Sequence, residues 1–106
     1  MDNFKIMYKI LKTLEASMDL EQVNQDSVSY TKLGITEERY NRILKMLLKK
    51  GYIDGIKVQQ YIDGETIINT ENIEITIEGL QFLEENGLMK KIHNTAKGIK
   101  EITPFI

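Results

Sequence analysis

Apolar residues recur every three or four positions between residues 36 and 50, which predicts an amphipathic helix. Thr36 is a good N-cap, and Gly51 follows the last apolar position, where helices commonly end. Ile35 and Tyr40 have the spacing of a hydrophobic staple around the cap. The stripe that would face a core consists of Tyr40, Ile43, Leu44, Leu47 and Leu48.

The first part of the chain shows the same period from about Asn3 to Ser17, with Asp2 as the expected cap. The predicted buried stripe consists of Phe4, Met7, Tyr8, Leu11, Leu14 and Met18. Residues 19–28 are polar and mixed, which favours a loop or a very short strand. Ser29 can then cap a short helix that Gly34 ends.

Residues 52–77 are rich in Ile, Val, Thr and Tyr, the composition of strands. The tetrapeptide Tyr-Ile-Asp-Gly occurs at 52–55 and at 61–64, which predicts two turns of similar chemistry. Ile73, Ile75 and Ile77 alternate with polar residues, so the last strand is expected to bury one face. Thr76 can cap a following helix, which Asn86-Gly87 is expected to end.

The predicted helix at 88–102 carries Leu88, Ile92, Thr95, Ile99 and Ile102 at spacings of four, three, four and three. This is the spacing of a two-heptad seam. Such a short seam has to pack on the body of the protein or on a second copy, and the latter would form a homodimer.

The predicted order is three helices, two strands and further C-terminal helices. The tight Leu-Gly-Ile turn joins the second and third helices. This order is typical of a winged helix-turn-helix of class α+β, in which three helices pack on a small antiparallel wing. At 106 residues, we expect residues 1–106 to form a single domain.

The whole chain resembles the YjcQ-like family of small proteins from Gram-positive bacteria and their prophages. Three segments carry the resemblance: MDNFKIMYKILKTLE, KLGITEERYNRILKMLLKKGYIDGIKV and ITIEGLQFLEENGLMKKIHNTAKGIKEI. The resemblance implies a winged-helix-like fold and an origin in a phage or mobile element. It implies no catalytic motif.

The amino-acid composition limits the cellular compartments in which the protein is expected. The chain has no cysteine, which excludes disulfides and thiolate metal sites and fits a reducing cytoplasm. The N-terminus lacks the pattern of a signal peptide, and no stretch approaches the roughly 20 apolar residues of a membrane span. We therefore expect a cytoplasmic protein without a membrane partner.

Charge is segregated along a chain whose net charge is −2. Residues 36–50 carry five Lys or Arg and two acids, and residues 88–106 carry four Lys and one acid. Residues 51–87 carry one Lys and eight acids. The basic third helix and the acidic region after it therefore favour different partners.

The third helix suggests contact with double-stranded DNA, because this helix enters the major groove in many winged helices. The candidate DNA-binding residues are Arg39, Asn41, Arg42, Lys45 and Lys49. Arg and Asn can read base edges, and Lys can hold phosphates. The alternative is an ordinary solvated face, and Glu37 and Glu38 would repel phosphate at the end that usually meets the bases.

The whole region predicted to form the wing, residues 51–77, favours a second hypothesis. Lys57 is its one cation, against Asp54, Asp63, Glu65, Glu71 and Glu74. Acidic groups weaken attraction to the phosphate backbone. Tyr61, Ile62, Ile67 and Ile68 could instead form a sticky edge for a protein partner, or simply cover the core. The alternative function is thus a protein-interaction module that does not bind DNA.

The sequence offers little for catalysis or for a cofactor. His93 is the single histidine, and no other ligand accompanies it at the spacing of a metal site. Glu37-Glu38 and Glu84-Glu85 are adjacent, so each pair points to different sides of a helix. We therefore expect no enzyme activity, no catalytic residues, no metal and no cofactor.

Overall fold

The computed structural model describes the backbone of residues 2–98 and the side-chain surroundings of residues 2–87. The fold is α+β. Its elements in chain order are α1 (Asn3–Ala16), the 3₁₀ turns η1 (Ser17–Asp19) and η2 (Gln25–Val28), α2 (Tyr30–Leu33), α3 (Glu37–Lys49), β1 (Ile53–Asp54), β2 (Lys57–Gln60), β3 (Thr66–Asn69), β4 (Glu74–Ile75) and α4 (Ile77–Gly98).

The strands form one antiparallel hairpin with an interruption. β1 pairs with β4, where Ile53 lies opposite Ile75. β2 pairs with β3, where Val58 lies opposite Ile68. This outer part of the hairpin and its turn, residues 57–69, are called the wing below. The α2–α3 pair followed by this hairpin agrees with a winged helix-turn-helix.

The two Tyr-Ile-Asp-Gly copies have different roles in this hairpin. Gly55 and Gly64 both have positive φ, +83° and +90°. Only the copy that contains Gly64 reverses the chain, with Gly64 N–H donating to the carbonyl of Tyr61 at 2.9 Å. Gly55 lies between β1 and β2, where a Cβ would come within 1.9 Å of the Asn72 carbonyl oxygen. This close approach requires glycine.

The predicted helix starts and stops are confirmed for the first three helices. Four side-chain oxygens accept a backbone N–H of the first helical turn, at N···O distances from 2.9 to 3.2 Å: Asp2, Ser29, Thr36 and Thr76. Gly34 and Gly51 end α2 and α3 in the left-handed conformation, with φ of +73° and +79°.

The core lies between α1, α3, the base of the hairpin and the start of α4. The buried stripe of α1 differs from the predicted one, because Phe4 and Met18 are 66% and 60% exposed, while Ile6 and Ile10 are buried. Apolar residues cover more than half of the circumference of this helix, so its spacing allows several orientations. Packing against α3 and α4 selects the face that contains Ile6, Ile10, Leu11 and Leu14.

The helix predicted to end at Asn86-Gly87 does not end there, because α4 continues to Gly98. The Asn86 amide donates to the Phe82 carbonyl one turn back, at 2.8 Å, inside the helix. Glycine inside a helix costs only about 1 kcal/mol, which the continuous helix tolerates. The prediction for Ile77 was also wrong, because it begins α4 after the Thr76 cap and is 71% exposed.

Residues 19–28 form a loop with short 3₁₀ turns, and no strand forms there. Val28 at the end of η2 is buried in the core. Gln25 also connects this segment to the base of the wing. Its amide donates to the Thr70 carbonyl at 3.1 Å, and the Thr70 hydroxyl donates to the Gln25 amide oxygen at 2.6 Å.

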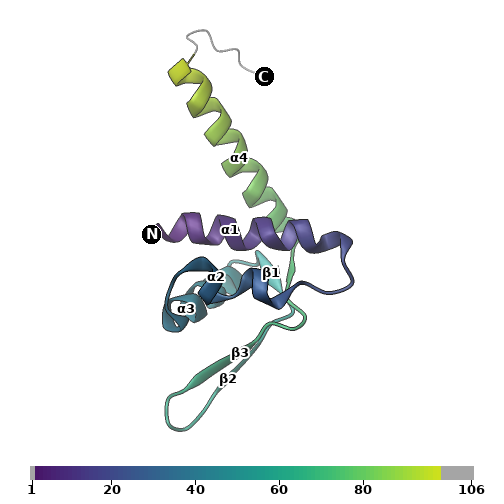
Figure 1. The fold of residues 1–106 in the computed structure, drawn as a ribbon, viewed down its shortest axis with the longest axis vertical. Coiled ribbons are helices and arrows are strands. Elements are labelled where there is room, and N and C mark those ends of the chain that lie inside the picture. Colours follow the sequence, from purple (N-terminus) through teal and green to yellow (C-terminus); the bar gives the residue numbers. More distant parts are fainter. Residues whose placement is uncertain (1, 99–106) are drawn as a thin grey trace.

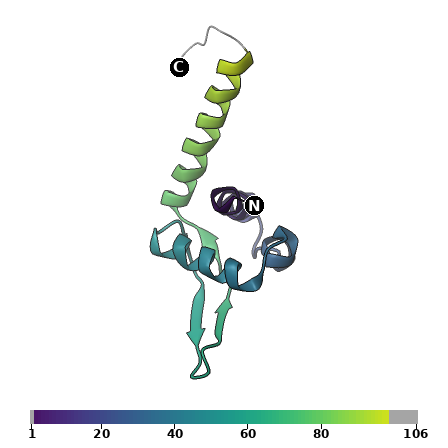
Figure 2. The ribbon, with the colours of Figure 1, turned by 90° about the vertical axis from the view of Figure 1, so that its left-hand side faces the viewer.

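The wing and α4 project from opposite ends of the body (Figures 1 and 2). The molecule is accordingly elongated, with principal extents of 58, 29 and 23 Å. Of the predicted seam, Leu88 and Ile92 lie in the projecting part of α4, and Ile99 and Ile102 lie outside the described residues. Across residues 2–98, no helix combines the length and the apolar content that a membrane crossing requires.

Candidate nucleic-acid interface

Helix α3 presents a row of cationic side chains on the side opposite the core. Tyr40, Ile43, Leu44 and Leu47 face inward and are buried. With 100° between successive residues, the outward face consists of Glu38, Arg42, Lys45 and Lys49. Arg42 and Lys49 are exposed, and Lys45 is half-buried. The helix itself runs across the base of the hairpin (Figure 2).

Arg39 has a different position from the other predicted DNA-binding residues. Its guanidinium donates from Nε and Nη2 to the side-chain oxygen of Asn3 on α1, at 3.0 and 2.7 Å. These hydrogen bonds connect the first turn of α3 to the first turn of α1. Arg39 therefore has a role in helix packing that its sequence context did not indicate.

Asn41 lies on the opposite flank of α3 from Arg39 and is half-buried. The five predicted residues thus do not form one surface. Only Arg42, Lys45 and Lys49 share a row, which is spaced three and four residues apart and follows the helix axis. These three residues form the candidate interface.

The first turn of α3 is acidic. Glu37 and Glu38 are exposed there, where the positive end of the helix dipole and the free backbone N–H groups favour carboxylates. Glu38 also belongs to the outward face, one turn before Arg42. An approaching phosphate would be repelled by Glu38 at this end and attracted along the rest of the row.

Tyr40 holds α3 against the segment before α2. Its hydroxyl donates to the Val28 carbonyl, and its ring lies 5.9 Å from the ring of Tyr30. Burial raises the pKa of Tyr40 to about 12, because the interior disfavours the phenolate. The neutral hydroxyl therefore persists at physiological pH, and the orientation of α3 rests partly on it.

The wing combines polar and apolar groups. In the β2–β3 register, Lys57, Gln59, Ile67 and Asn69 share one face, and Ile68 on the other face packs against the core. The Tyr61 hydroxyl donates to Gln59 Oε1 at 3.3 Å, and the Ile62 side chain at the tip is fully exposed. The wing thus exposes amides and one amine along its strands and an apolar side chain at its tip.

A second group of cations lies on α1 and α2. Lys9 and Lys12 of α1 and Lys32 of α2 line a recess of about 320 Å³, together with Tyr8, Thr13, Ser27 and Leu33. Lys12 also forms an ion pair with Glu15 at 3.0 Å. Lys32 belongs to another helix, so the fold is needed to bring its amine to the same recess as Lys9 and Lys12.

In the described part of the chain, no group of three or more His, Asp or Glu side chains converges as a metal site would require.

Comparison with known proteins identifies a family model and a relative that each cover most of the chain. The family model described as YjcQ protein matches residues 8–102. The chain is also 29% identical over 102 residues to the uncharacterized protein YjcQ of Bacillus subtilis (strain 168), covering 95% of this chain and 97% of that protein. No solved structure matched the chain.

Proposed function

This chain belongs to the YjcQ protein family, and we propose that it binds double-stranded DNA through the outward face of α3. The observation that carries the proposal is the row of Arg42, Lys45 and Lys49 on the face of α3 opposite the core. An arginine can donate two hydrogen bonds to a guanine edge, and lysines neutralise phosphates. A phage or prophage regulator is the role this proposal gives the protein, as a binding protein and not an enzyme.

The charges around the row set the expected strength of binding. The net charge of −2 and the acids of the wing reduce general attraction to DNA. Three phosphate contacts would give a salt dependence with a slope of about −3 in log–log form. We therefore expect binding that is measurable at low salt and weak at physiological salt unless the DNA carries a preferred sequence.

The test is a fluorescence-anisotropy titration of random-sequence duplex DNA at several salt concentrations. The double variant Arg42→Ala/Lys45→Ala should bind at least tenfold more weakly at low salt, with a flatter salt dependence. The matched control is Lys90→Ala/Lys91→Ala, which removes the same charge from α4, the helix that projects from the body (Figure 1). Equal loss in both double variants would contradict a specific role of α3.

A second function is favoured by the tip of the wing, where Tyr61, Ile62 and Ile67 are exposed. Exposed apolar side chains on a hairpin suit a protein partner that adds a strand or covers the tip. This alternative predicts no DNA binding even at low salt. It also predicts a partner that co-purifies with the wild-type chain and is lost with Ile62→Asp.

A further inference from the structure

Gln25 forms two hydrogen bonds with one residue at the base of the wing. Its side-chain nitrogen donates to the Thr70 carbonyl at 3.1 Å, and the Thr70 hydroxyl donates to its side-chain oxygen at 2.6 Å. The two residues are 45 positions apart in sequence. A carbonyl can only accept hydrogen bonds, so the nitrogen of the Gln25 amide has to face it. The pair therefore defines one orientation of this side chain against the hairpin.

Thr70 lies where the hairpin is interrupted. Residues 55–56 on one arm and residues 70–73 on the other separate the β1–β4 pair from the β2–β3 pair. An arm with extra residues bends and locally disrupts the ladder of backbone hydrogen bonds, as at a β-bulge. The Thr70 carbonyl also accepts from the Ile73 N–H at 3.2 Å, which closes a turn in this arm. The direction of the wing is therefore set at the interruption and not by a continuous ladder.

The wing is exposed beyond its base. All four residues of β2 are exposed, and so are residues 61–65 of the turn. At the base, Ile56 and Ile68 are half-buried and pack against the core. Apolar packing is non-directional, whereas a hydrogen bond restricts the angle between its partners. The apolar contacts thus hold the base of the wing on the body, and the hydrogen bonds of Gln25 restrict its direction.

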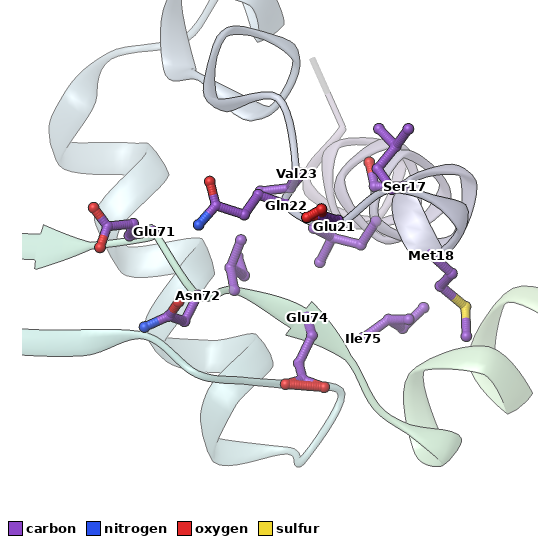
Figure 3. Close-up of a pocket in the computed structure, with 12 residues that line it drawn as sticks. Ser17, Met18, Glu21, Gln22, Val23, Glu71, Asn72, Glu74 and Ile75 are labelled. Carbon is purple, nitrogen blue, oxygen red and sulfur yellow. The ribbon is translucent and has the colours of Figure 1, made fainter.

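The two segments that carry Gln25 and Thr70 separate on one side of this pair. A groove of about 350 Å³ lies between residues 17–23, which follow α1, and residues 71–75, which include β4. Figure 3 shows Ser17, Met18 and Glu21 on one side of this groove and Glu71, Asn72 and Glu74 on the other. Packed side chains do not fill this space, so the two hydrogen bonds have a larger share in holding the segments together.

The segment that contains Gln25 is also fixed to α3. Gln25 begins η2, and Val28 at the end of η2 is buried in the core. The Val28 carbonyl accepts a hydrogen bond from the Tyr40 hydroxyl of α3. Ser29, the next residue, is the N-cap of α2. Residues 25–28 therefore connect the base of the wing to α3.

We propose that the Gln25–Thr70 pair is a latch that holds the wing in one direction relative to α3. With the latch closed, the exposed faces of α3 and of the wing keep a fixed relation. A partner that covers both faces then meets a preorganised surface, and less conformational entropy is lost on binding. Without the latch, the wing turns about the interruption of the hairpin. The inference concerns the free protein, so its test is independent of the DNA binding proposed above.

The test measures the distance between the wing and α3 in solution. The chain has no cysteine, so Glu37→Cys and Glu65→Cys place one spin label on α3 and one on the turn of the wing, both at exposed positions. Double electron–electron resonance then gives the distribution of distances between the two labels. The distribution should be single and narrow in the labelled protein. Gln25→Ala and Thr70→Val, each added to this background, should broaden it at least twofold.

Two further variants separate the latch from a general loosening of the wing. Thr70→Ser retains the hydroxyl and the carbonyl, so it should keep the narrow distribution. Gln59→Ala also removes a glutamine amide, one that accepts a hydrogen bond from Tyr61 within the wing, and should leave the distribution unchanged. A distribution that stays narrow in both Gln25→Ala and Thr70→Val would overturn the proposal. A distribution that is broad before any latch substitution, or that broadens equally with Gln59→Ala, would overturn it as well.

Discussion

The guanidinium of Arg39 on α3 donates two hydrogen bonds to the side-chain oxygen of Asn3 on α1. The pair connects the first turns of two helices that are 36 positions apart in sequence. It fixes one end of α3 without contributing to its outward face. Arg39 and Arg42 are thus expected to differ in what their loss affects.

Asn3→Ala should lower the free energy of unfolding by about 1 kcal/mol or less, because the hydrogen bonds are exposed to water. DNA affinity should stay within twofold of the wild type, since Asn3 lies on α1. Urea denaturation and the anisotropy titration measure the two quantities on one preparation. A large loss of DNA affinity with Asn3→Ala would show that the orientation of Arg39 matters for binding.

Glu38→Gln should strengthen DNA binding, because it removes a carboxylate from the outward face one turn before Arg42. The expected gain is about two- to fivefold at low salt and smaller at high salt, where the charge is screened. Glu84→Gln makes the same charge change on an exposed site of α4 and is the control. Equal gains in both variants would indicate that only net charge matters.

Gly87→Ala should stabilise the protein by about 0.5–1 kcal/mol, because alanine is the better residue inside a helix. The new Cβ would lie 3.6 Å from the Tyr8 hydroxyl, which is an ordinary contact. The predicted end of the helix at Asn86-Gly87 would give the opposite result, since a left-handed glycine resists replacement. Thermal denaturation of the two proteins distinguishes the continuous α4 from an interrupted one.

Gly55→Ala should destabilise the hairpin far more than Gly64→Ala. Both residues have positive φ, but a Cβ at Gly55 would collide with the Asn72 carbonyl, and one at Gly64 would meet nothing within 4 Å. We expect a loss of about 3 kcal/mol or more at Gly55 and about 1–2 kcal/mol at Gly64. Chemical denaturation provides both values, and similar losses would contradict the close approach of the two arms.

The stability of the protein should depend on Tyr40 at alkaline pH. Its folded pKa of about 12 lies above the value of about 10 for an exposed tyrosine. The contribution of the neutral hydroxyl is therefore fully present below pH 10 and is lost as the pH rises through 12. Tyr40→Phe should be less stable than the wild type at pH 8, and the difference should shrink above pH 10. A constant difference would exclude this ionisation.

Local chemistry explains which parts of the fold could be predicted. The caps at Asp2, Ser29 and Thr36 and the glycine stops at Gly34 and Gly51 depend on residues within one turn, so their sequence signals are direct. The buried face of α1 depends on tertiary packing, and so does the continuity of α4 through Asn86-Gly87. Both predictions failed at points where local spacing allowed more than one outcome.

The surface of α3 was predictable for a similar reason. Helical geometry alone places Arg42, Lys45 and Lys49 opposite the apolar stripe. The partner of Arg39 lies on another helix, and the groove joins residues 17–23 to residues 71–75. Contacts across such sequence distances carry no periodic signal, so neither feature could be predicted from one sequence.

The opposed projections of the wing and α4 determine how the protein diffuses. The radius of gyration is 16.1 Å, whereas a compact domain of this length has about 13 Å. A rod-like monomer experiences more friction than a sphere of the same mass, so it elutes early from a gel-filtration column. Its apparent size there approaches that of a compact dimer. Retention volume would therefore report the direction of α4 as much as the number of chains in the particle.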